Sequence, residues 1–337
     1  MSRLFVCPSV QFLHRYPIAA DTSGIVLRIG CLRFAAEPAA VGCLVNVRNG
    51  QQGMSLFHID CELSYDVTQQ TVFLLDILVP DTIDQHVIAE SLTTSPPLFA
   101  EYLYDQWALN RLLRIDAPAG RLNVRYLANV EVEREGTDPE AAELPIAQLP
   151  SDVLPYLLPT RYCEADLLFP LALRKFGTLA PGSQRVESVC QWIRDNVDYL
   201  IGTSPPHTTA RDTLAARAGV CRDFAHLAIS LCRALNIPAR FVTGYARYAD
   251  PPADFHALFE AYLGGQWRLF DPTRLSPVED LVRIGTGRDA SEVAFSTFFG
   301  AAKLRRLSPL VEAMRSRHPR DALIELQSPG SGIQLAA

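Results

Sequence analysis

The sequence lacks the features that mark membrane, zinc-binding and nucleic-acid-binding proteins. No apolar run approaches the roughly 20 residues that a membrane helix needs. The eight cysteines include no CxxC pair, which argues against a structural zinc site. A net charge of -6 without a strong cluster of Lys and Arg argues against a nucleic-acid partner. We therefore expect no membrane, no nucleic acid, no metal and no cofactor.

The N-terminus also lacks a secretory pattern. Charged and proline residues interrupt every apolar run that follows Met1. In a chain without an export signal, cysteines are expected to be reduced, buried small residues. The predicted location is the cytoplasm, and the sequence leaves a homodimer open.

What the chain does contain is enough apolar residues for two hydrophobic cores. It has 337 residues, of which 48% are hydrophobic and 20% charged, as in an ordinary globular protein. Residues 1–135 show short runs of strand type without helical periodicity. The clearest runs span residues 25–29, 43–47, 71–79 and 122–132. This pattern predicts an N-terminal β-sandwich domain.

The pattern changes after this domain. Residues 136–160 are rich in proline and predict a linker. The apolar residues from Cys221 to Leu235 then recur at helical spacing, and a proline three residues later ends the helix. We expect a second domain over residues 161–320 and a loose tail over residues 321–337.

Three residues with reactive side chains follow one another as Cys221, His256 and Asp271. Cys221 stands at the start of the predicted helix, where the helix dipole favours a thiolate. A histidine can accept the thiol proton, and a carboxylate can hold that histidine in the right tautomer. Each residue alone is more often structural, but the ordered set predicts acyl transfer by a cysteine nucleophile.

A glycine pair at residues 264–265 predicts how His256 and Asp271 meet. The strands on either side form a hairpin with a two-residue turn, in which Leu263 faces Gln266. Asp271 then lies diagonally from His256 on the same face of the sheet, with Cβ atoms roughly 5–8 Å apart. A register slip of one residue would place the two side chains on opposite faces.

Other residues near this set have weaker claims to a role. Asp223 lies in the first turn of the helix, where it either caps backbone donors or supports the site. His226 lies about 140° around the helix from Cys221, so we expect it to be structural. A metal site made by His207, Cys221 and His256 is not favoured.

The segments around these residues resemble the bacterial transglutaminase-like cysteine peptidase family. The nucleophile segment has the sequence GVCRDFAHL. The likeness is carried by residues 219–227, 237–245, 254–257 and 269–273, and it continues at residues 158–163 and 287–290. A weaker likeness covers the N-terminal β region, so the resemblance spans nearly the whole chain.

The resemblance implies a papain-like α+β core, in which the helix with the cysteine packs against an antiparallel sheet that carries His and Asp. It makes Cys221 the nucleophile, His256 the general base and acid, and Asp271 the residue that orients His256. Related enzymes often place a donor for the oxyanion before the nucleophile segment, which makes Tyr199 a candidate. The Cys221 backbone N–H, at a helix N-terminus, is the firmer oxyanion donor.

The predicted function is acyl transfer or hydrolysis at a peptide or amide carbonyl, through a thioester, with a protein or peptide substrate. Hydrolysis of the protease or amidase type is favoured over transamidation, because no distinct amine site is readable and water is always available. The alternative is a catalytically idle core that acts as a peptide- or protein-binding module.

Overall fold

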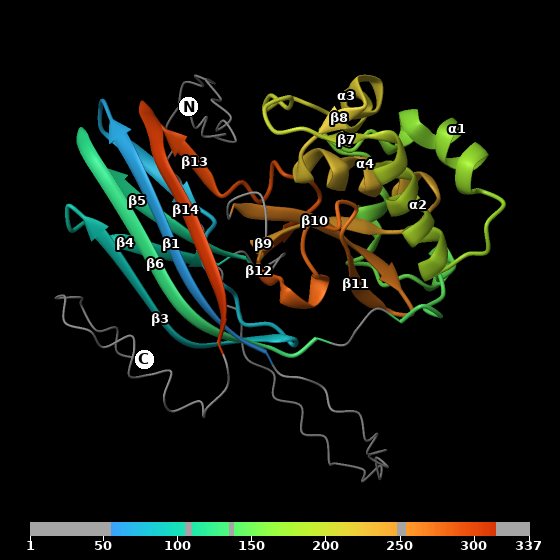
Figure 1. The fold of residues 1–337 in the computed structure, drawn as a ribbon, viewed down its shortest axis with the longest axis horizontal. Helices are drawn as coiled ribbons and strands as arrows, with labels where there is room; N and C mark the ends of the chain where they lie inside the picture. The colour runs from blue at the N-terminus through green and yellow to red at the C-terminus, as the bar shows by residue number, and fades with distance from the viewer. Residues whose placement is uncertain (1–54, 105–109, 135–137, 248–253, 315–337) are drawn as a thin grey trace, which may run out of the picture.

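The computed structural model describes residues 55–104, 110–134, 138–247 and 254–314. The predicted strands at residues 25–29 and 43–47 and the predicted tail lie outside these residues. Within the described part, a β-sandwich and an α+β core lie side by side (Figure 1). The predicted α+β class with an N-terminal sandwich is confirmed.

The sandwich consists of two four-stranded antiparallel sheets. The first has the order β14-β1-β6-β3, with β14 at Ala302–Met314, β1 at Ser55–Val67, β6 at Gly120–Val132 and β3 at Gln85–Ser95. The second has the order β13-β2-β5-β4, with β13 at Ser296–Phe299, β2 at Thr71–Leu75, β5 at Arg111–Ala117 and β4 at Ala100–Tyr104. Inward side chains of both sheets, such as Phe57, Phe73 and Val124, form one apolar core.

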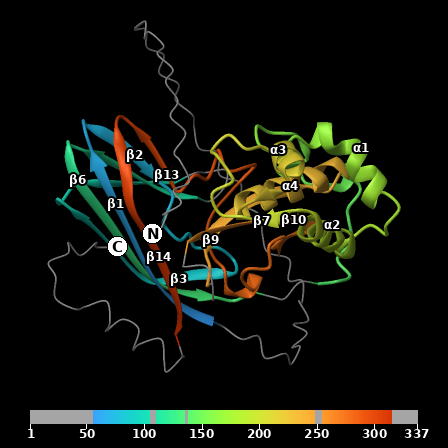
Figure 2. The same cartoon turned by 45° about the horizontal axis from the view of Figure 1, so that its top comes forward.

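The second unit packs helices against another antiparallel sheet. The helices of the described part are α1 at Ala165–Phe176, α2 at Ser183–Asn196, α3 at Ala210–Ala216 and α4 at Cys221–Ala234. The sheet has the order β11-β10-β9-β12, with β11 at Gln266–Phe270, β10 at Phe255–Leu263, β9 at Ala239–Tyr245 and β12 at Val282–Gly287. Shorter elements are β7 at Asp198–Tyr199, β8 at Ala218–Gly219, and 3-10 turns at Ile146–Gln148, Leu154–Leu157 and Val278–Asp280. Figure 2 shows this sheet between the helices and the sandwich.

Helix α4 is the central helix of the core. Every residue from Asp223 to Ala234 is buried, and the apolar side chains of the helix pack in one cluster with Ala257 and Phe259 of β10. The predicted helix, Cys221 to Leu235, agrees with α4 to within one residue. Burying each large apolar side chain contributes roughly 1.5–3 kcal/mol. Packing therefore holds the N-terminus of α4, and Cys221 with it, in a defined place.

The last two strands return to the sandwich. β13 pairs with β2, and β14 pairs with β1 along almost its whole length. The core domain predicted over residues 161–320 includes residues 296–314, which the structure instead pairs with the strands of the sandwich. The physical reason is that β1 and β2 would otherwise expose unpaired edges, and these strands cover them.

The predicted linker packs against the core. The Ser183 N–H donates to the Ala141 carbonyl at 2.9 Å, and the Gly264 N–H donates to the Ala142 carbonyl at 2.8 Å. Further along the linker, Leu149 and Val153 are buried against Tyr262 of β10. The segment therefore acts as part of the core surface and not as a free connection.

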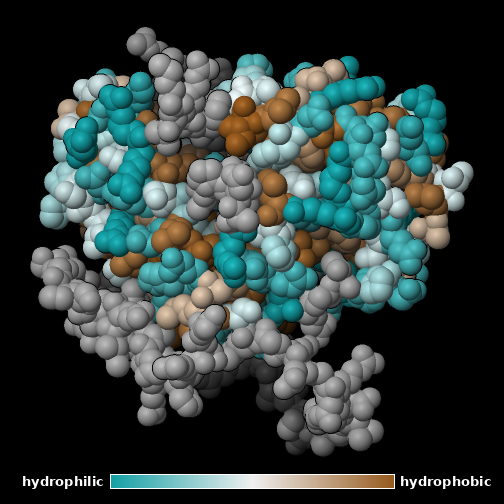
Figure 3. Space-filling view, in the orientation of Figure 1, coloured by the Kyte–Doolittle hydropathy of each residue, from teal (hydrophilic) through white to brown (hydrophobic). Residues whose placement is uncertain are grey.

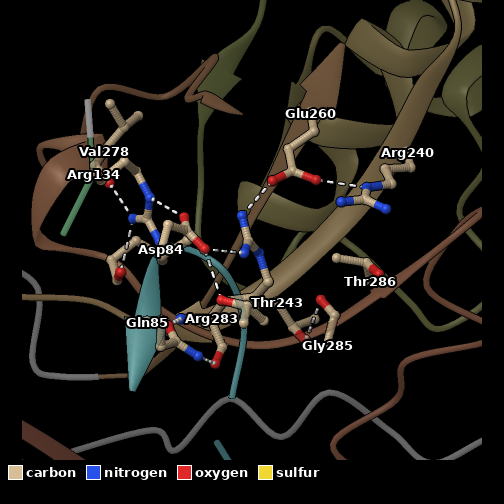
Figure 4. Close-up of polar contacts among 12 residues, drawn as sticks. Asp84, Gln85, Arg134, Arg240, Thr243, Glu260, Val278, Arg283, Gly285 and Thr286 are labelled. Atoms are coloured by element: carbon tan, nitrogen blue, oxygen red, sulfur yellow. Dashed lines mark hydrogen bonds and ion pairs between the residues drawn. The ribbon is translucent and has the colours of Figure 1, made fainter. Parts of the chain in front are cut away.

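Two side-chain amides of the sandwich cover the edge of the core sheet. Gln85 accepts the backbone N–H of Arg283 at 2.8 Å and donates to its carbonyl at 2.9 Å (Figure 4). Asn110 forms the same pair of bonds with Thr286, also at 2.8 and 2.9 Å. Because β12 is an edge strand, these amides take the place of a neighbouring strand and satisfy its backbone groups.

A buried network of ion pairs joins the same two units. Glu260 of β10 is 1% exposed and accepts from Arg240, at 2.5 Å, and from Arg283. Arg283 also pairs with Asp84 of the sandwich at 3.0 Å, and Arg134 pairs with Asp84 at 2.8 Å (Figure 4). Charges from both units therefore neutralise one another at their contact.

Among the described residues, no helix is both long enough and apolar enough to cross a membrane. On the face shown in Figure 3, hydrophilic residues predominate and hydrophobic residues form separate patches. Exposed apolar side chains include Leu167 and Leu173 on α1, and Leu200 and Ile201 directly after β7.

Candidate active site

Cys221 is the first residue of α4, and its side chain is half-buried. The preceding residue, Val220, is extended, so the chain turns into the helix at the cysteine. The first backbone N–H groups of a helix have no partner within the helix and attract negative charge. This position suits a thiolate, and it suits an oxyanion that forms next to it.

Asp223 fixes the turn into α4. Its carboxylate accepts the backbone N–H of Val220 at 2.9 Å and pairs with Arg222 at 3.1 Å, and the residue is 1% exposed. A Cβ atom on Gly219 would lie only 2.8 Å from the Cβ of Asp223, so glycine is needed for this close approach. Of the two roles considered for Asp223, the structure shows contacts of the capping kind.

His256 and Asp271 meet as the hairpin arithmetic predicts. Leu263 pairs with Gln266, and the two turn glycines have positive φ angles of 60° and 81°, which confirms the predicted two-residue turn and register. His256 Nε2 lies 2.9 Å from Asp271 Oδ2, and both residues are buried. Thr273 donates to the other carboxylate oxygen of Asp271 through its backbone N–H, at 2.8 Å, and its hydroxyl, at 2.7 Å.

The surroundings of His256 favour its protonated form. Burial alone would lower the pKa of His256, but hydrogen bonds to Asp271 and Cys221, together with their negative charges, raise it to about 10. Burial would likewise raise the pKa of Asp271, and the bonds from His256 and Thr273 hold it below its ordinary value. The structure thus brings Cys221, His256 and Asp271 together, with His256 in contact with both partners.

Tyr199 also reaches Cys221. β7 and β8 pair in parallel, with Tyr199 opposite Gly219, and this pairing carries Tyr199 to the nucleophile segment. Burial, followed by the negative charge of Cys221, raises the pKa of the Tyr199 hydroxyl. Tyr199 therefore stays a protonated donor at neutral pH, beside the N–H that opens the helix.

The other two histidines considered in the sequence, His226 and His207, differ in burial. His226 is fully buried, its ring stacks on Tyr162 at 5.0 Å, and its Nε2 accepts the Ala290 N–H at 3.1 Å. Burial lowers the pKa of His226 to about 3, so it is neutral, in keeping with its predicted structural role. His207 is exposed, and no group of three or more metal-binding side chains occurs among the described residues.

One residue near the site received no role from the sequence. Asp254 stands two residues before His256, and burial raises the pKa of its carboxyl to about 6. Its charge acts on Tyr199, and the charge of His256 acts on it in turn. The sequence offered one signal for Asp254, which is its position two residues before His256. This position does not predict whether the carboxylate has a cationic partner.

Comparisons with known proteins cover both units of the chain. Residues 171–272 match the family model of the transglutaminase-like superfamily, and residues 55–152 match that of the bacterial transglutaminase N-terminal domain. The first of these segments contains Cys221, His256 and Asp271.

One solved structure is similar over most of both chains. A candidate cysteine protease from Cytophaga hutchinsonii is 39% identical, with a TM-score of 0.76, over 79% of this chain and 93% of that chain. An uncharacterised protein of Mycobacterium leprae is 27% identical over 226 residues, which are 62% of this chain and 79% of that protein. An uncharacterised protein of Mycobacterium tuberculosis is 33% identical over 142 residues, which are 38% of this chain and 45% of that protein.

Proposed function

Because the chain belongs to the transglutaminase-like superfamily, we propose that it is an enzyme that attacks a peptide or carboxamide carbonyl with the Cys221 thiolate. The observation that carries this proposal is the contact of His256 with both Cys221 and Asp271 at the start of a buried helix. An imidazolium beside the thiol and a helix N-terminus below it both favour the thiolate.

The reaction proceeds through a thioester. The Cys221 sulfur attacks the carbonyl carbon and forms a tetrahedral oxyanion. Because His256 Nε2 faces Asp271, the other ring nitrogen is the one that exchanges protons with the reacting groups. The imidazolium gives its proton to the leaving nitrogen, the C–N bond breaks, and the amine departs. General acid–base catalysis of this type contributes roughly 10²–10⁴-fold.

The oxyanion is held by the Cys221 backbone N–H and the Tyr199 hydroxyl. The pairing of β7 with β8 holds these two groups near each other. A substrate carbonyl oxygen that enters between them accepts from both, with the tyrosine rotating its proton toward the oxyanion. Tyr199 is therefore a catalytic donor in this proposal, and Asp223 acts only through its hold on the start of α4.

Water or an amine then resolves the thioester. His256 takes a proton from the acceptor, which attacks the thioester carbon, and the Cys221 thiolate leaves. With water the product is a carboxylic acid, and with an amine it is a new amide. We favour hydrolysis with a protein or peptide substrate, since water is always available as an acceptor.

The test is the reactivity of Cys221 in the folded protein. A short pulse of iodoacetamide at pH 7, followed by peptide mapping, should modify Cys221 well before the fully buried Cys163, Cys190 and Cys232. His256→Ala should slow this labelling at least tenfold.

The control is His86→Ala, which changes an exposed histidine of the sandwich and should leave the labelling rate unchanged. Labelling of Cys221 only after denaturation, with no effect of His256→Ala, would instead favour the alternative of a peptide-binding module without catalysis. Mass spectrometry of a glutamine-containing peptide library in H₂¹⁸O with cadaverine then separates hydrolysis from amine transfer.

A further inference from the structure

The loop that follows β7 is bonded to the chain on both sides of Cys221. Before the cysteine, the Leu200 N–H donates to the Gly219 carbonyl at 2.9 Å, which extends the pairing of β7 with β8 by one residue. After the cysteine, the Arg222 guanidinium donates to the Ser204 hydroxyl at 2.5 Å. Neighbouring strands lie about 4.8 Å apart, so these two attachments hold the loop directly beside the nucleophile segment.

This loop presents two apolar side chains to solvent. Leu200 is 48% exposed and Ile201 is 47% exposed. Among the exposed large apolar side chains of the described residues, only this pair is consecutive in sequence. Single exposed apolar residues are common on protein surfaces, whereas apolar residues that are grouped at a reactive site are typical of a binding surface.

The backbone under these side chains is fixed. Leu200 is bonded through its N–H, and its carbonyl accepts the Thr203 hydroxyl at 2.7 Å. Gly202 has a φ of 93°, a conformation that favours glycine and closes the turn. The two apolar side chains therefore stand on a defined turn, and an apolar ligand would meet a surface that is already in place.

The distance from Cys221 suits a side chain of the substrate. An extended peptide advances about 3.3 Å per residue, so a peptide whose carbonyl carbon meets the Cys221 sulfur carries its neighbouring side chains within one or two residue lengths of it. The loop beside Gly219 lies at this range. An apolar side chain placed there would cover Leu200 and Ile201 and remove apolar surface from water on both partners.

We propose that Leu200 and Ile201 form an apolar subsite that selects substrates with a hydrophobic side chain next to the attacked carbonyl. This inference rests on the proposed function of Cys221. The hydrophobic group has two sources. One is the acyl part, which Cys221 retains in the thioester, and the other is the amine part, which leaves or, in amine transfer, enters.

The first experiment compares N-methyl-iodoacetamide with N-hexyl-iodoacetamide at Cys221. The thiolate displaces iodide from both and forms a thioether, so the two reagents differ only in the apolar chain. Their rates at pH 7 are followed by peptide mapping. Wild type should favour the hexyl reagent. Leu200→Ser combined with Ile201→Ser should lower the ratio of the hexyl to the methyl rate about tenfold, at the lower end of what a hydrophobic pocket distinguishes.

The matched control is Leu167→Ser combined with Leu173→Ser, which replaces two exposed leucines of α1 and should leave the ratio unchanged. If the variant of the loop slows both reagents equally, the loop only holds the nucleophile segment and the proposal is overturned. It is also overturned if the ratio stays unchanged while size-exclusion chromatography shows that a dimer separates, since a second copy then covers the loop. A wild type in which neither reagent modifies Cys221 before denaturation would count against the proposed function itself, whatever the ratio.

The second experiment separates the two sources of the hydrophobic group. p-Nitrophenyl acetate and p-nitrophenyl hexanoate acylate Cys221 with release of p-nitrophenolate. If the acyl part supplies the group, the double variant of Leu200 and Ile201 lowers the ratio of the hexanoate to the acetate rate about tenfold.

The acetyl-enzyme then partitions between water and an amine, either methylamine or hexylamine. The amine attacks the thioester carbon, gives a proton to His256 and releases the thiolate of Cys221. If the amine part supplies the group, the double variant lowers the yield of N-hexylacetamide relative to N-methylacetamide and leaves the ratio of the ester rates unchanged. Loss of neither preference would overturn the proposal.

Discussion

Replacing Glu260 by glutamine tests how firmly the strand that carries His256 is held. Glu260 lies four residues after His256 on β10, is 1% exposed, and pairs with Arg240 and Arg283. The variant keeps the shape of the side chain but removes the negative charge between two arginines. Removing one partner of a buried ion pair costs about 3–5 kcal/mol. Because Arg283 keeps Asp84 at 3.0 Å, we expect the lower end, about 3 kcal/mol.

A double-mutant cycle shows whether the cost comes from an orphaned charge. Arg283→Met alone should also cost about 3 kcal/mol, because Glu260 keeps only Arg240. Glu260→Gln with Arg283→Met removes both charges, and it leaves Asp84 with Arg134 at 2.8 Å. The double variant should therefore lower the free energy of unfolding by about 2 kcal/mol, which is clearly less than the sum of the two single effects.

The assay is urea unfolding followed by tryptophan fluorescence. Trp267 reports on this region because the guanidinium of Arg240 lies 4.3 Å from its ring centre. A loss of about 3 kcal/mol lowers the urea midpoint by roughly 1 M at the slopes usual for proteins. If Glu260→Gln shifts the midpoint by less than about 0.3 M, or if the single effects simply add, the network does not stabilise the fold as argued.

Acid provides an internal check on the same variant. Burial would raise the pKa of Glu260, but Arg283 and Arg240 outweigh it and lower the pKa below 4.5. A lowered folded-state pKa means that the carboxylate stabilises the fold above its ordinary pKa and loses this effect as pH falls through the folded value. The difference between wild type and Glu260→Gln should therefore persist at pH 5 and shrink in stronger acid.

The remaining predictions concern the site and its support. Asp271→Asn should lower kcat about 10²–10⁴-fold, because His256 loses the partner that orients it, and a kinetic assay with any accepted substrate checks this. Tyr199→Phe should lower kcat about 10–100-fold with little change in KM, as expected for a donor used mainly in the transition state. The folded-state pKa of His256 is raised from 6.5 to about 10, so its protonation stabilises the fold fully below pH 6.5 and this contribution is lost as pH rises through 10. Urea midpoints measured against pH should show this loss, and His256→Gln should abolish it. Gln85→Met should lower the free energy of unfolding by about 2–3 kcal/mol in urea titrations, because the buried backbone groups of Arg283 lose their partners.

Local contacts explain why so much of the site could be predicted. A two-glycine turn leaves one favoured register for the strands on either side, so the positions of His256 and Asp271 follow from short-range geometry. The helix that begins at Cys221 is marked by its apolar period and by the proline after it. The family resemblance joined these pieces into one core, and the comparisons support that family.

Contacts between distant segments could not be predicted in the same way. β13 and β14 have strand-forming sequences, but these sequences do not predict pairing with β2 and β1, which lie more than 200 residues earlier. The sequence likewise gives no sign that the side-chain amides of Gln85 and Asn110 form hydrogen bonds with β12. Such pairings depend on which edges remain open after the chain has folded.

The sequence by itself determined the order of Cys221, His256 and Asp271, the hairpin that aligns two of them and the helix that begins at the third. Only the tertiary structure decided that Tyr199 reaches Cys221 through the β7–β8 pair, and that Asp254 has no arginine partner among the described residues. The physical reason is range. The types of neighbouring residues determine the backbone geometry of a short segment. The environment of a charge, in contrast, depends on every segment that folding brings around it.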